Sequence, residues 1–116
     1  MNKYMLGFML LFVCSNAHAV EVDKLVNAIY IAEGGANTSH PYGILEKYKT
    51  TTPRQACINT VNHALRDYTK EVFSDYEFIV FLGNRYCPVG AENDPTNLNK
   101  NWIPNVWSLY QKEMLK

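Results

Sequence analysis

The sequence of 116 residues lacks several features that would assign a chain quickly to a functional class. It has three cysteines but no C-x-x-C pair, which excludes the usual zinc and thiol-redox motifs. Its eleven basic and eleven acidic residues balance, so we expect no basic surface for a nucleic acid. It also has no low-complexity stretch and no internal repeat. These absences favour one compact domain with a single core and no nucleic-acid partner.

The first nineteen residues have the pattern of a secretory signal peptide. Lys3 is the only charge before residues 5–13, a run that is apolar apart from one glycine. Ala17-His18-Ala19 then places small residues at the positions that a signal peptidase reads. The apolar run is too short to span a bilayer comfortably, so we expect no permanent membrane anchor. We expect cleavage after Ala19 and a periplasmic or secreted protein.

Cleavage leaves residues 20–116 as the mature domain. It removes Lys3 and no acid, so ten basic and eleven acidic residues remain. It also removes Cys14. The residue before Cys14 is Val13, whereas lipoprotein signals usually carry a small residue there, so lipidation is the less favoured alternative.

Cys57 and Cys87 remain as an even pair in an exported protein, which predicts a disulfide between them. The bridge would close a loop of about thirty residues and stabilise the fold by roughly 3–4 kcal/mol. The alternative, a metal or redox site, lacks both the C-x-x-C spacing and nearby histidines. We therefore favour the structural interpretation.

Hydrophobic periodicity predicts a first helix over residues 23–33. A second helix begins with Thr52 as N-cap and Pro53 at the first position, and its apolar face runs to about Phe73. A third begins at the capping-box pattern of residues 74–77 and ends toward Gly83, although its apolar centre would also suit a buried strand.

The connections are polar, and the last helix follows the longer of them. Residues 34–52 are predicted to be loop, with room for one short hairpin. Residues 84–101 are long for a connection in a compact domain, and long ordered loops often carry function. A fourth helix is expected from about Asn101. The fold class is therefore mainly α, with about four helices, little or no sheet and one disulfide.

Glu33 is the candidate catalytic residue. Val22, Leu25, Val26 and Ile29 have the spacing of one buried helix face, and Glu33 continues that face. The following glycine is suited to ending the helix, which places the carboxylate at the negative end of the helix dipole. Burial and the dipole both disfavour the charged form, so both favour a general acid. The alternative is a solvated helix-terminal glutamate with no role.

A helix ending in Glu33, two glycines and then Tyr42-Gly43-Ile44 resembles the soluble lytic transglycosylase (SLT) domain family of the lysozyme-like superfamily. The pattern is also similar to phage-type N-acetylmuramidases. The resemblance covers residues 28–45 and the general helical plan. It implies that Glu33 is catalytic and that the following segment lines a glycan groove. The implied substrate-binding residues are Tyr42, Gly43, Ile44, Leu45 and, further along the chain, Tyr86.

The sequence departs from the family pattern at three points. Gly34 stands where the family usually has Ser, and Glu46 stands where the groove segment usually has Gln. The later Ala-Tyr-Asn motif has no clear match, and Asn84-Arg85-Tyr86 is the proposed replacement. These departures bear on the catalytic geometry more than on the fold.

The resemblance implies cleavage of the β-1,4 bond between N-acetylmuramic acid and N-acetylglucosamine in peptidoglycan, with no cofactor. Hydrolytic glycosidases use a second carboxylate. Lytic transglycosylases need none, because the 6-hydroxyl of the sugar closes onto the anomeric carbon. We favour transglycosylation because no candidate stands out as a partner for Glu33. The candidates for a second carboxylate are Glu46, Asp75, Glu77, Glu92 and Asp94.

Two other functions stay open at this point. The chain could bind peptidoglycan or a protein partner without cleavage, or act as an exported inhibitor or immunity-type protein. Enzymes of this size that resemble the family often serve secretion, conjugation or pilus systems, so such an apparatus is an expected partner beside peptidoglycan. His40 lies near the proposed groove, where a solvated loop histidine is the simpler interpretation, and no metal site is supported.

Overall fold

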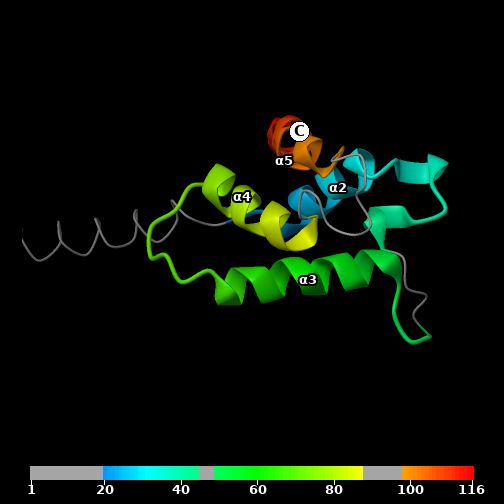
Figure 1. Cartoon of the computed structure of the whole chain (residues 1–116), viewed down its shortest axis with the longest axis horizontal. Helices are drawn as coiled ribbons and strands as arrows, with labels where there is room; N and C mark the ends of the chain where they lie inside the picture. The colour runs from blue at the N-terminus through cyan, green and yellow to red at the C-terminus, as the bar shows by residue number, and fades with distance from the viewer. Residues whose placement is uncertain (1–19, 45–48, 88–97) are drawn as a thin grey trace, which may run out of the picture.

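The computed structural model describes residues 20–44, 49–87 and 98–116. These residues form helices and turns and contain no β-strand, which confirms the mainly α expectation (Figure 1). The predicted signal peptide lies outside the described residues. Short 3₁₀ turns occupy Gly35–Asn37 (η1), Pro41–Gly43 (η2) and Leu98–Asn101 (η3). The α-helices are α2 (Val22–Ala32), α3 (Pro53–Asp67), α4 (Asp75–Tyr86) and α5 (Trp102–Met114).

Side-chain caps fix the starts of α3 and α4, as the sequence predicts. The Thr52 hydroxyl accepts a hydrogen bond from the backbone N–H of Gln55 at 3.1 Å. Ser74 and Glu77 form a reciprocal capping box, in which the Glu77 N–H donates to Ser74 Oγ at 3.1 Å. Each cap satisfies an amide that would otherwise have no partner in the first turn of its helix.

The second helix is shorter than predicted, because α3 ends at Asp67 and not near Phe73. Tyr68 leaves the helical conformation there. The centroid of its ring lies 4.8 Å from that of Phe73 and 4.8 Å from that of Phe81. Helical periodicity up to Phe73 fails to predict this end. The aromatic contacts come from the following turn and from α4, so tertiary packing overrides the local pattern.

The third helix is longer than predicted, because α4 continues through Gly83 to Tyr86. Gly83 does not end the helix but lies buried against α5. A Cβ at this position would come within 2.6 Å of Ile103 Cγ1 and 3.0 Å of Trp102 Cε3. The glycine therefore permits α4 and α5 to approach each other closely. From the sequence alone, a glycine in this role cannot be distinguished from a glycine that ends a helix.

Helices α2 and α5 lie against each other and run in opposite directions (Figure 1). At one end the backbone N–H of Glu21 donates to the Tyr110 hydroxyl at 3.2 Å, and Lys24 Nζ donates to the backbone oxygen of Glu113 at 3.1 Å. At the other end Trp102 reaches Glu33. This pairing brings the first and last helices together and sets the position of Glu33.

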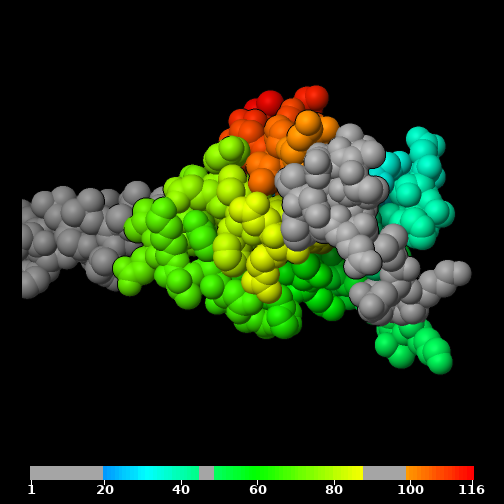
Figure 2. Space-filling model, in the orientation of Figure 1, coloured from blue at the N-terminus to red at the C-terminus, as the bar shows by residue number. Residues whose placement is uncertain are grey.

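The core lies between α2 and α5 and is closed by α3 and α4. Of the predicted stripe on α2, Leu25, Val26 and Ile29 are fully buried and Val22 is partly buried, in line with the helical spacing. Turns η1 and η2 project at one end of the bundle (Figure 2). The core side chains with no exposed surface include Leu25, Val26, Ile29, Cys57, Val61, Phe78, Ile79, Leu82 and Val106.

The predicted disulfide is absent, and Cys57 and Cys87 are both thiols. Cys57 is buried in α3, and its sulfur lies 3.8 Å from the Tyr86 hydroxyl. Cys87 follows the end of α4. An even cysteine count and an exported chain suggest a bridge, but they do not supply the sulfur–sulfur geometry that a bridge requires.

None of the helices in the described residues is long and apolar enough to cross a membrane.

Replacing Gly83 with Ala should destabilise the protein, although alanine is the better helix former. The new methyl group would push against Ile103 and Trp102, and overpacking of this kind costs about 1–3 kcal/mol. Urea unfolding followed by circular dichroism measures the change. The exposed neighbour Asn84 is the matched control, since Asn84→Ala should change the unfolding free energy by less than about 0.5 kcal/mol. A Gly83→Ala protein more stable than the wild type would contradict the close approach.

Cys57 should react slowly with alkylating reagents in the native protein. Burial raises the pKa of its thiol to about 11, so roughly a hundredfold less thiolate is present than for an ordinary cysteine. Mass spectrometry after iodoacetamide treatment, with and without denaturant and without reductant, measures this reactivity. We expect Cys57 and Cys87 to be labelled fully once the protein is denatured, whereas a bridge would leave both unlabelled.

Candidate active site

Glu33 occupies the C-cap position of α2, one residue beyond the last helical residue. Its N–H still donates to the backbone oxygen of Ile29 at 3.0 Å, so the helical turn carries Glu33 toward the protein interior. Gly34 then adopts φ +104°, a left-handed conformation suited to glycine. The predicted helix end is confirmed, and the Glu33 side chain is half-buried.

Trp102, in the first turn of α5, holds one oxygen of the Glu33 carboxyl group. Its indole N–H donates to Glu33 Oε1 at 2.8 Å. Burial raises the pKa of Glu33, and the hydrogen bond from Trp102 opposes that rise because it stabilises the charged form. Burial is the larger effect, so the net pKa shift is upward. This is the direction that a general acid requires.

Gly43 lies against the other oxygen of the same carboxyl group. A Cβ at Gly43 would stand 2.9 Å from Glu33 Oε2, closer than side chains normally approach. Gly43 also has φ +70°, which further favours glycine at this position. The residue that resembles the start of the family's groove segment is therefore in direct contact with the candidate catalytic carboxyl group.

Tyr42 braces the turn from inside the protein. It has φ +62°, a left-handed conformation that is uncommon for a residue with a side chain. Its ring packs on Tyr30 with centroids 5.1 Å apart, and Arg54 donates to its hydroxyl at 3.3 Å. Only 7% of Tyr42 is exposed, so its ring is a core side chain and is not presented to a glycan. The turn that it holds in place is what presents Gly43.

Tyr86 links three of the elements around Glu33. Its hydroxyl donates to the backbone oxygen of Tyr42, which ties the end of α4 to turn η2. Its ring lies 5.4 Å from that of Trp102, centroid to centroid, with 31° between the planes. Burial raises the pKa of the phenol, with smaller contributions from the nearby Cys57 and Glu33. Tyr86 therefore lies at the site, where it contacts Trp102 and the backbone next to Gly43, the two groups that flank the carboxyl group.

A chain of polar contacts connects turn η2 to the end of α5. Arg54 donates to Asn27 Oδ1 at 2.9 Å as well as to Tyr42, and Asn27 donates to Glu113 Oε1 at 2.9 Å. Glu113 is 7% exposed and also pairs with Lys116. Hydrogen bonds from Lys116 and Asn27 lower the pKa of Glu113 and so favour its charged form.

The remaining predicted groove residues divide into two groups. Ile44 is partly buried and packs against the core next to Gly43. Leu45 lies outside the described residues. In the proposed Asn84-Arg85-Tyr86 replacement, Tyr86 reaches the site, whereas Arg85 pairs with Asp67 at 2.8 Å on the surface. The sequence match therefore brings Glu33, Gly43, Ile44 and Tyr86 together, with Tyr42 behind them.

The two candidates for a second carboxylate that the structure describes have other partners. Asp75 accepts a hydrogen bond from Tyr110 at 2.8 Å, and Glu77 completes the cap of α4 and pairs with Lys70. The other candidates, Glu46, Glu92 and Asp94, lie outside the described residues.

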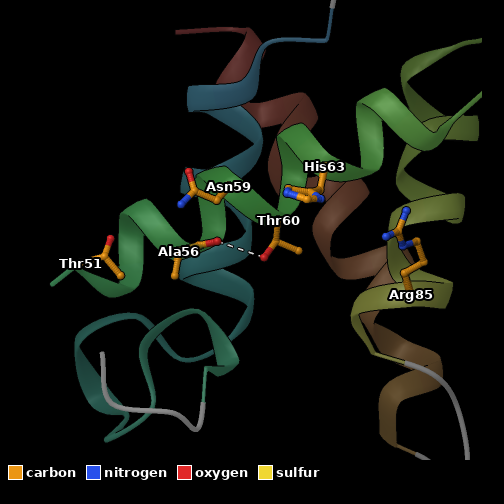
Figure 3. Close-up of a pocket in the computed structure, with 6 residues that line it drawn as sticks. All are labelled: Thr51, Ala56, Asn59, Thr60, His63 and Arg85. Atoms are coloured by element: carbon orange, nitrogen blue, oxygen red, sulfur yellow. Dashed lines mark hydrogen bonds between the residues drawn. The ribbon is translucent and has the colours of Figure 1, made fainter. Parts of the chain in front are cut away.

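An open depression of about 370 Å³ lies away from Glu33. Figure 3 shows Asn59, Thr60 and His63 along α3, with Arg85 projecting from α4. Neither Glu33 nor Gly43 lines it, so this depression is not the cleft expected above the carboxyl group. The Glu33 carboxyl group is half-buried next to Gly43, and the glycan groove above it stays a prediction.

No group of three or more His, Cys, Asp or Glu side chains in the described ranges is arranged to hold a metal ion.

Comparison of the chain with family models, curated proteins and solved structures finds no match. The resemblance at residues 28–45 therefore rests on the sequence of those residues, and membership of the family stays a prediction.

Sequence reasoning missed Trp102 as the partner of Glu33. Trp102 falls in the predicted last helix, and nothing in the sequence nearby points to Glu33. The two residues are 69 positions apart, and no local pattern couples them. The position of Cys57 near Glu33 was missed for the same reason. Both contacts depend on how the helices pack.

Glu33→Gln should raise the thermal stability of the protein at neutral pH. The pKa of Glu33 is higher in the folded state than in the unfolded state. The contribution of Glu33 to the free energy of unfolding is therefore fully present below the unfolded pKa of about 4.3. It is lost as pH rises through the folded pKa. Glutamine cannot ionise, and its oxygen still accepts from Trp102. We expect an increase of a few degrees in Tm at pH 7 that disappears near pH 3.

Differential scanning calorimetry from pH 3 to pH 8 tests this expectation. The exposed Glu71 is the control, because Glu71→Gln should leave Tm unchanged throughout. A Glu33→Gln protein that is less stable than the wild type at pH 7 would mean that the carboxylate is stabilised in the folded protein.

Proposed function

We propose that this protein is a peptidoglycan lytic transglycosylase with Glu33 as its acid and base. One observation carries the proposal: a half-buried carboxyl group with a raised pKa is held by Trp102 on one oxygen and contacts Gly43 on the other. The acidic group and the glycine of the groove segment are the two elements that carry the family resemblance. A lysozyme-like arrangement of the helices belongs to the same proposal.

The chemistry follows from a protonated Glu33. The acid gives its proton to the glycosidic oxygen as the bond from that oxygen to the anomeric carbon breaks and the oxygen keeps the electron pair. The 6-hydroxyl oxygen of the muramic acid residue then bonds to the anomeric carbon. The carboxylate of Glu33 takes the hydroxyl proton and returns to its starting state. Atoms balance without water, and the product is a 1,6-anhydro sugar.

Transglycosylation is favoured over hydrolysis because a hydrolase needs a second carboxylate across the bond. Asp75 and Glu77 are the candidates within the described residues, and each is engaged in a structural contact on α4. One acid that acts alone fits the intramolecular route, in which the sugar supplies the nucleophile.

The cellular setting belongs to the proposal too. An exported protein cut after Ala19 would meet peptidoglycan in the periplasm, or outside the cell if it is secreted. A small wall-cleaving enzyme of this kind would suit a secretion, conjugation or pilus apparatus, which has to open the wall locally.

A second candidate function is peptidoglycan binding without cleavage. Two observations favour it: the ring of Tyr42 is buried away from any glycan, and the open depression lies on α3 and not above Glu33. In that case Glu33 would be a buried acid without a reaction to catalyse.

Purified peptidoglycan incubated with the mature protein should release anhydromuramyl products, detected by mass spectrometry. Glu33→Gln should lower the rate by about 10²- to 10⁴-fold, because it removes the proton donor while keeping the acceptor for Trp102. Glu71→Gln, on the exposed surface, serves as the control and should cleave at the wild-type rate.

Products with a reducing muramic acid would keep Glu33 as the acid but make the protein a hydrolase. Retained binding to peptidoglycan without cleavage by the wild type would contradict the enzyme proposal and favour the binding module.

A further inference from the structure

We propose that Trp102 is a positioning residue that assigns different roles to the two oxygens of Glu33. Oε1 accepts the indole N–H, and Oε2, over Gly43, carries the proton that is delivered to the glycosidic oxygen. This inference rests on the proposed function. It adds the residue that orients the acid and the side from which the sugar oxygen approaches.

The first step of the argument is the chemistry of the donor. An indole N–H can donate but cannot accept, so the oxygen facing it must offer a lone pair in both protonation states. A protonated carboxyl group has one oxygen that carries the proton and one that remains an acceptor. With Trp102 Nε1 at 2.8 Å from Oε1, the proton of the neutral acid belongs on Oε2.

The second step is the space next to Oε2. The indole N–H of Trp102 donates to Oε1 and not to Oε2. Oε2 lies instead against Gly43, where any side chain would come within 2.9 Å of it. The absence of a Cβ keeps Oε2 uncovered on that side. A proton on Oε2 is not held by the indole, so the hydrogen bond between Trp102 and Oε1 can stay in place while that proton is transferred.

The third step is the rigidity of the donor. Trp102 is 5% exposed, and its ring is stacked against Tyr86 and packed against Gly83. The same Tyr86 donates to the backbone oxygen of Tyr42, the residue before Gly43. The two groups that flank the carboxyl group are therefore held by one tyrosine, so their separation is fixed by the fold.

The titratable groups that face Glu33 do not provide another explanation for its orientation. They are Cys57 of α3 and Tyr86 of α4, among the residues that the structure describes. Burial raises the pKa of both, so both are neutral across the pH range in which a glutamic acid titrates. Neither α5 nor turn η2 presents a titratable side chain to the carboxyl group; they supply Trp102 and Gly43.

The first test needs the wild-type protein and no substrate. NMR resonances of the indole N–H groups of Trp102 and Trp107, and of the Glu33 carboxyl carbon, are followed as pH is changed. We expect the Trp102 resonance to move with the same midpoint as Glu33. Trp107, which packs on Tyr76, is the internal control and should not follow that midpoint. In Glu33→Gln the movement of the Trp102 resonance should disappear. A Trp102 resonance that ignores the titration of Glu33 would overturn the inference.

The second test separates positioning from a structural role. Trp102→Phe removes the donor and keeps a ring for Tyr86 to stack on. We expect kcat to fall roughly tenfold or more with little change in KM, since a displaced acid is costly at the transition state. The alkaline limb of the activity profile should move to higher pH, because the donor that favours the charged form is lost. Trp107→Phe should change neither quantity. An equal loss of rate at every pH would indicate structural damage and overturn the positioning role.

The third test addresses Oε2. Gly43→Ala should abolish most cleavage and alter the titration of Glu33, because the methyl group would meet Oε2. Gly35→Ala is the matched control: Gly35 also has a positive φ, of 56°, but a methyl group there makes only an ordinary contact with Tyr30. A Gly43→Ala protein that folds and cleaves normally would overturn the assignment of Oε2.

The outcomes also separate this inference from the proposed function. Linked titration of Trp102 and Glu33 without any cleavage of peptidoglycan would support the orientation of the acid and reject the transglycosylase. Cleavage that depends on Glu33 but is unaffected by Trp102→Phe would support the enzyme and reject the role of Trp102.

Discussion

The antiparallel pairing of α2 with α5 is the constraint on which the rest of the structure depends. Glu21 meets Tyr110 at one end of this pair, and Glu33 meets Trp102 at the other. The first helix supplies the acid and the last helix supplies its hydrogen-bond donor. Helices α3 and α4 then close the core and bring Tyr86 to the same end. The position of the acid is therefore a property of the whole bundle and not of α2 alone.

Local signals in the sequence predicted what local energetics determine. The caps at Thr52 and Ser74 and the helix end at Glu33 are all present, because each rests on a few neighbouring backbone groups. The predictions failed where distant packing decides. Helix α3 ends early at Tyr68, whose ring packs in an aromatic cluster. Gly83 lies inside α4, where a larger residue would collide with α5.

The candidate site shows the same division. Glu33 and Gly43 could be found from the sequence because ten residues and a recognisable pattern connect them. Trp102 could not, since it lies 69 positions from Glu33 in the sequence. Tyr42 precedes Gly43 as the sequence requires, but its ring points into the core against Tyr30, where Arg54 holds its hydroxyl. An aromatic residue in a segment predicted to line a groove can therefore support the backbone of that segment.

The environment of Glu33 sets the cost of burying a carboxylate against the hydrogen bond that the group accepts from Trp102. A buried, unpaired carboxylate is costly by several kcal/mol, whereas one hydrogen bond to a charged group is worth about 1.5–3 kcal/mol. The hydrogen bond from Trp102 therefore orients the group without outweighing the cost of burial, which agrees with the net upward shift of the Glu33 pKa. A cationic donor at the same place would favour the carboxylate more strongly and oppose an acid's role. A neutral indole donor orients the carboxyl group while the net shift of its pKa stays upward, and Gly43 lies against the oxygen that the indole does not contact.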